Sequence, residues 1–228
     1  MAENEITRLL FAHQDLKYKE FSEKLVPDTH YEMIGVRVPE IRKIVKNTLS
    51  YDEIYGFLNA EHFYYEEYMA HGLFIALKIR NVDETYSLLD RFLPYIDNWA
   101  ICDTVAISLK KPTKDKDAFF ENALRWIKSD KVYTVRFGIV CLLAHFTDKS
   151  YTDKLTEIIL GVKTDEYYIN MALAWLISVM LVKDYEGSVG IIERKILPKF
   201  VQNKAIDKAR ESFRIGKEQK EYLKLFKI

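Results

Sequence analysis

The residues best suited to chemistry in this 228-residue chain stand in one short run, Asp97–Thr104. Asp97 is placed to cap a helix that begins near Asn98, so that Trp99 and Asp103, four residues apart, project from one face. A carboxylate beside an indole suits a site that stabilises positive charge, because both groups attract cations. An Asp among apolar neighbours is also costly unless it has a partner or a task. The alternative is structural, with Asp103 capping or ion-pairing with a neighbouring helix.

Further candidates lie in the second half of the chain. Arg136 stands near the start of an apolar helix, where it either pairs with a carboxylate or contacts a phosphate. Trp175 lies in a run of apolar residues, where an aromatic side chain is usually part of the core. Residues 194–228 hold 11 Lys or Arg against 4 Asp or Glu, which predicts a local basic surface in a chain of zero formal net charge. The alternative for this stretch is a solvated helix face.

The composition predicts a folded helical protein. Hydrophobic residues make up 49% and charged residues 30% of the chain, and only 8 Gly and 5 Pro interrupt it.

The five histidines show no metal-binding spacing, and there is no Gly-rich phosphate loop and no G-x-S-x-G motif, so we expect no metal and no cofactor. Glu66 and Glu67 are interpreted as serving the dipole of a helix, with a catalytic role for the carboxylate pair as the less favoured alternative. The most apolar run, Met171–Val182, is too short to span a bilayer, and no secretory leader opens the chain, so a cytoplasmic protein without membrane contact is expected.

Helical periodicity recurs from end to end. Apolar residues at helical spacing predict one side of a helix between Lys131 and Phe146, facing the core. Pro39 is expected in the first turn of another helix, after a short loop. Similar patterns predict helices at residues 6–25, 63–79, 84–93, 99–109, 119–127, 151–160 and 167–182. Such a series predicts an all-α fold, an α-solenoid of antiparallel helix pairs with one continuous core and a concave face, as a single domain over residues 1–228.

These residues, in this order, resemble the AlkD-like DNA alkylation repair enzymes, and the similarity covers essentially the whole chain. The resemblance rests on Ile34–Lys43, Asp97–Trp99 with Asp103, Arg136, Trp175 and Ala209–Arg214. It implies a solenoid of HEAT-like helix pairs whose concave face binds DNA. It also implies a monomeric DNA glycosylase, a hydrolase of N-glycosyl bonds, that acts on duplex DNA containing purines alkylated at N3 or N7.

The resemblance also implies a role for each residue. Asp103 is the catalytic carboxylate, Trp99 and Trp175 contact the deoxyribose of the lesion, and Arg136 touches the DNA beside it. The family excises bases without flipping them into a pocket. We expect Asp103 to be open to the groove, and Lys208, Arg210 and Arg214 to grip the phosphate backbone. Two alternatives remain, a non-catalytic HEAT-like scaffold that binds protein or DNA on its concave face, and a relative that binds DNA but has lost excision.

Overall fold

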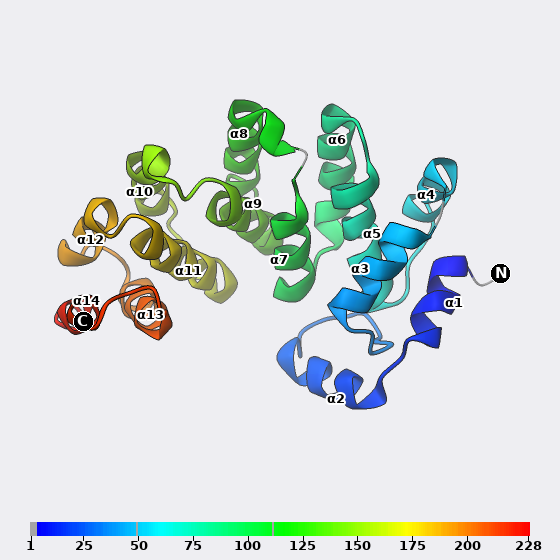
Figure 1. The fold of residues 1–228 in the computed structure, drawn as a ribbon, viewed down its shortest axis with the longest axis horizontal. Helices are drawn as coiled ribbons and strands as arrows, with labels where there is room; N and C mark the ends of the chain where they lie inside the picture. The colour runs from blue at the N-terminus through cyan, green and yellow to red at the C-terminus, as the bar shows by residue number, and fades with distance from the viewer. Residues whose placement is uncertain (1–3, 49, 111) are drawn as a thin grey trace. The chain divides into compact units, whose positions relative to one another are not determined.

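The structure, a computed structural model, describes residues 4–48, 50–110 and 112–228, and every regular element in these ranges is a helix. The predicted all-α class is therefore confirmed. Contacts within the chain divide it into two compact units, Met1–Lys116 and Asp117–Ile228, which are described one after the other. Figure 1 shows the helices of both units in chain order.

The first unit contains seven α-helices and two short 3-10 helices among its described residues. They are α1 (Glu5–Ala12), α2 (Leu16–Leu25), α3 (Val38–Asn47), α4 (Tyr51–Leu58), α5 (Tyr65–Lys78), α6 (Val82–Phe92), η1 (Leu93–Tyr95), α7 (Trp99–Ser108) and η2 (Pro112–Lys114).

The helical pattern predicted over residues 6–25 corresponds to two helices, α1 and α2. The chain breaks between α1 and α2 because the Asp15 side chain accepts a hydrogen bond from the backbone N–H of Tyr18, at 3.0 Å, and so caps a new helix. The Gln14 side chain donates to the carbonyl of Ile34, at 2.8 Å. Hydrophobic periodicity alone does not register such a break, because both helices keep the same spacing of apolar residues.

The core of the first unit is built around α5. Helix α3 packs on α5, and α5 packs on α7, so alternate helices contact one another in series. The apolar residues of α5 cover most of its circumference, as expected for a helix surrounded by other elements. The helix approaches its neighbours closely at Gly72, where a Cβ atom would collide with Val105 of α7 and lie 2.9 Å from the ring of Phe92.

The loop before α3 is anchored to α5 by Glu66, a buried residue of that helix. Its carboxylate accepts hydrogen bonds from three consecutive backbone N–H groups, those of Ile34 at 2.8 Å, Gly35 at 2.7 Å and Val36 at 3.0 Å. Gly35 has a φ of +99°, which side-chain-bearing residues rarely adopt, and a Cβ there would lie 2.7 Å from the carbonyl of Asp15. The loop then delivers Pro39 into the first turn of α3, as predicted.

The second unit has the same kind of organisation. Its elements are α8 (Lys116–Ile127, whose first residue lies in the first unit), α9 (Val132–His145), η3 (Lys149–Tyr151), α10 (Thr152–Gly161), α11 (Tyr167–Lys183), α12 (Tyr185–Glu193), α13 (Lys199–Glu211) and α14 (Lys217–Lys224). Helix α9 packs on α11 and α11 on α13, while α10 packs on α12. In the described part of the chain no helix is both long and apolar enough to cross a membrane.

Candidate functional site

The start of helix α7 is set by Asn98 and not, as predicted, by Asp97. The Asn98 side chain accepts hydrogen bonds from the backbone N–H groups of Ala100, at 3.1 Å, and Ile101, at 3.0 Å. Its backbone is extended, as an N-cap requires, and asparagine caps as well as aspartate does, so the register shifts by one residue.

Asp97 has a different task, which is to hold the loop that follows α2. Its carboxylate accepts the Thr29 hydroxyl at 3.0 Å, the backbone N–H of His30 at 2.6 Å and the Asn98 side-chain amide at 2.7 Å. The indole N–H of Trp99 donates to the carbonyl of Leu25 at 3.1 Å. These contacts tie the first turn of α7 to the end of α2 and the loop after it.

Trp99 and Asp103 stand one turn apart near the start of α7, as predicted from their spacing. Trp99 is partly exposed, so some of its indole is accessible. Asp103, by contrast, is only 8% exposed, and the expectation of an open carboxylate is wrong. The reason is that α7 is enclosed on most of its circumference, because Ile101, Cys102, Val105 and Ala106, which surround Asp103 on several sides of the helix, are all completely buried.

In the second unit Arg136 is largely buried and has a structural contact. It is 6% exposed, and its guanidinium donates to the carbonyl of Tyr168, in the first turn of α11, at 2.7 Å. Through this hydrogen bond Arg136 joins α9 to α11.

Trp175, Lys208 and Arg214 come together at one cavity of the second unit, of about 310 Å³. Trp175 is therefore not a core residue, because its partly exposed side chain lines this cavity. The full lining is Trp175, Ser178, Val179, Val182, Lys183, Lys208, Glu211, Ser212 and Arg214. Lys183 was missed by the sequence analysis, because the helix predicted over residues 167–182 ends one residue before it, whereas α11 includes it.

Arg210 lies outside the cavity lined by Trp175, Lys208 and Arg214. Its guanidinium lies 3.8 Å from the carboxylate of Glu221 on α14, and it does not line the cavity of Trp175. Positions 208 and 210 of a helix lie about 200° apart around its axis, so α13 cannot present both side chains to one surface. Of the three predicted basic residues, Lys208 and Arg214 share a surface, and Arg210 does not.

The two sets of residues differ in character. Trp99 and Asp103 form an indole and carboxylate pair in the first unit, whereas Trp175, Lys183, Lys208 and Arg214 form an aromatic and cationic wall in the second. The first arrangement can stabilise a developing positive charge, and the second can hold an anion such as a phosphate.

Residues 6–211 match the model of one protein family, described as DNA alkylation repair enzyme. The searches of curated proteins and of solved structures returned no match. The matched residues include every candidate described above except Ser212 and Arg214.

Proposed function

The chain belongs to the DNA alkylation repair enzyme family, and from this membership we propose that it is a DNA glycosylase that removes purines alkylated at N3 or N7 from duplex DNA. The observation that carries the proposal is the family match over residues 6–211, which includes both the indole and carboxylate pair and most of the cationic wall.

The proposed chemistry needs one carboxylate. Alkylation at N3 or N7 gives the purine a positive charge, so the base leaves without a general acid. As the glycosidic bond breaks, positive charge builds on the deoxyribose, and Asp103 stabilises it and orients the attacking water. The burial of Asp103 strengthens this interaction, because a charge acts more strongly in surroundings of low dielectric constant.

The aromatic residues and the cations take supporting roles. Trp99 and Trp175 present ring faces to the cationic sugar, each contact contributing roughly 0.5–2 kcal/mol. Arg136 contacts a phosphate beside the lesion. Lys208 and Arg214 bind phosphates of the DNA at a greater distance from the lesion. These contacts position the duplex without reading its sequence.

Selectivity in this proposal comes from the lability of the lesion. An enzyme that acts only on a weakened glycosidic bond has no need of a cavity that excludes normal bases, so the base is not flipped. We expect release of 3-methyladenine and 7-methylguanine and little release of neutral lesions.

We also propose that the helices form HEAT-like pairs with a DNA-binding concave face, in a protein that acts as a monomer. The support is the serial packing of alternate helices, α3 on α5 on α7 in the first unit and α9 on α11 on α13 in the second. This arrangement is typical of stacked helix pairs, in which one helix of each pair forms a continuous inner layer.

The test is release of 7-methylguanine from methylated duplex DNA by the wild type and by Asp103→Asn. The substitution keeps the size of the side chain and removes its charge, so we expect the rate to fall by about 100-fold or more. Asp83→Asn, at an exposed position of α6, is the matched control and should keep the wild-type rate. Equal rates for wild type and Asp103→Asn would end the catalytic proposal.

One observation favours a second candidate, a scaffold that binds DNA or protein without excising a base. Asp103 is mostly buried and Arg136 already contacts a backbone carbonyl, as expected of two residues with structural roles. The same assay separates the two functions. A scaffold would bind the methylated duplex and release no base from it.

A further inference from the structure

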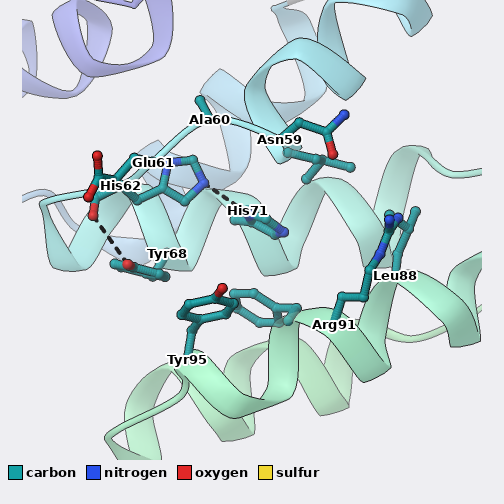
Figure 2. Close-up of a pocket in the computed structure, with 11 residues that line it drawn as sticks. Asn59, Ala60, Glu61, His62, Tyr68, His71, Leu88, Arg91 and Tyr95 are labelled. Carbon is teal, nitrogen blue, oxygen red and sulfur yellow. Dashed lines mark hydrogen bonds between the residues drawn. The ribbon is translucent and has the colours of Figure 1, made fainter.

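The first unit contains a second cavity, of about 620 Å³, that is lined by none of the residues discussed above as catalytic or DNA-binding. It lies between the connection from α4 to α5, the first half of α5, the end of α6 and η1 (Figure 2). Its volume is within the range of cavities that take small organic ligands. The lining is Leu58, Asn59, Ala60, Glu61, His62, Tyr68, His71, Leu88, Arg91, Phe92 and Tyr95.

Two histidines form a hydrogen-bonded pair in its wall. The Nε2 atom of His62 lies 2.8 Å from the Nδ1 atom of His71. His62 is 7% exposed, and among the described residues its Nδ1 atom has no hydrogen-bond partner. The ring of His71 stacks on Phe92, with centroids 4.7 Å apart and planes inclined by 13°.

This geometry decides which nitrogen atoms carry the protons. Burial, together with His62 and Arg91, lowers the pKa of His71 to about 3, and burial also lowers the pKa of His62, so both rings are neutral near pH 7. If His71 Nδ1–H were the donor, the buried Nδ1 of His62 would carry an unpaired N–H, which costs more than an unpaired lone pair. His62 therefore donates, and His71 carries its proton on Nε2. Figure 2 shows this second nitrogen of His71 on the side of the ring away from His62.

The rim supplies charged and polar groups that are not engaged with one another. Within the described residues, Arg91, Glu61 and Asn59 take part in no ion pair or side-chain hydrogen bond, and all three are exposed. In Figure 2 Glu61 and Arg91 lie at opposite ends of the cavity. One end thus offers a guanidinium near the His71 donor, and the other offers a carboxylate that can accept from an amino group.

Between these ends lies an aromatic surface. Tyr31 stacks on Tyr68, with centroids 3.9 Å apart, and Tyr68 lies nearly parallel to Tyr95, with centroids 6.1 Å apart. Tyr95 is 56% exposed, so much of its ring is uncovered. An uncovered tyrosine ring in a cavity is a stacking surface for a planar ring, and a nucleobase of any kind has such a face.

We propose that this cavity binds a nucleoside monophosphate, with the base stacked on Tyr95, the base edge at Glu61, and the phosphate at Arg91 and the Nε2–H of His71. An arginine beside a neutral imidazole N–H suits a phosphate, which accepts several charge-assisted hydrogen bonds. The site is separate from Asp103 and extends the protein beyond excision, to recognition of a free nucleotide.

The test is titration calorimetry of the full chain with three probes, AMP, adenosine and inorganic phosphate. AMP should saturate the protein with a Kd below about 1 mM. Adenosine and inorganic phosphate, each lacking one half of the recognised group, should bind at least about tenfold more weakly.

Variants then place the binding site. Arg91→Gln and Tyr95→Leu change exposed side chains and should each weaken AMP binding about tenfold, while Arg80→Gln, an exposed arginine outside the cavity, should not. Asp103→Asn should bind AMP like the wild type, so the fate of the excision proposal does not affect this one. The inference is overturned if AMP does not bind, or if Arg91→Gln and Arg80→Gln bind AMP equally well.

Discussion

The buried glutamates of α5 accept hydrogen bonds from backbone N–H groups of the segments around them. Glu66 is 1% exposed, and it receives three backbone N–H groups of the loop before α3. Its neighbour Glu67 accepts the N–H groups of Phe63, at 2.8 Å, and Tyr64, at 3.1 Å, and also the hydroxyl of Thr7. Glu67 thus serves the start of its own helix, as interpreted from the sequence. The use of Glu66 by a distant loop was not foreseen.

Replacing Glu66 by alanine should destabilise the protein severely. Three N–H groups would lose a charged acceptor in a buried place, and each unpaired group costs about 1–3 kcal/mol, so we expect a loss of about 3 kcal/mol or more in the free energy of unfolding. Urea denaturation measures it. Glu20→Ala, at an exposed position of α2, is the control and should stay within about 0.5 kcal/mol of the wild type. A similar small change for Glu66→Ala would show that the loop is held by other contacts.

At the scale of the helices, the position of α7 decides what Trp99 and Asp103 can do. Asn98 fixes where the helix begins, Asp97 attaches that beginning to the loop after α2, and Trp99 attaches it to the last residue of α2. The depth of Asp103 then depends on how closely α7 packs on α5. Gly72 sets this distance, because it places the backbone of α5 against Val105.

A side chain at position 72 should therefore push the two helices apart. Gly72→Ala adds a Cβ where Val105 and Phe92 already lie, so we expect a loss of about 1–3 kcal/mol despite the better helix propensity of alanine. Gly56→Ala, in α4, is the matched control, because a Cβ at this position would meet nothing within 4 Å. This substitution should stabilise the protein by about 0.5–1 kcal/mol. Thermal or urea unfolding of both variants checks the pair, and equal shifts would refute the close approach.

At the scale of the whole molecule, the chain has 34 basic and 34 acidic residues, so we expect the proposed DNA binding to depend on a local field. The cavity wall with Trp175 gathers Lys183, Lys208 and Arg214, with Glu211 as its one acidic member. A neutral protein with such a wall should show DNA binding that is weak at high salt and strong at low salt.

Removing two of these cations should reduce the salt dependence of DNA binding. In the Lys208→Gln and Arg214→Gln double variant, the slope of log Kobs against log salt should become shallower by about 2, because each phosphate contact contributes about 0.9. The control variant carries Lys217→Gln and Lys224→Gln, two exposed positions of α14, and should keep the wild-type slope. Fluorescence anisotropy with a short duplex at several salt concentrations measures both slopes, and equal slopes would exclude this wall from the DNA interface.

The sequence by itself determined the all-α class, most helices and the pairing of Trp99 with Asp103, because hydrophobic spacing and i, i+4 neighbours are local properties. Tertiary packing decided the rest. The burial of Asp103, the hold of Glu66 on a loop 30 to 32 residues earlier and the His62–His71 pair all depend on segments that meet only after folding. A side chain's spacing along a helix shows which face it occupies, whereas its solvent exposure depends on what packs against that face.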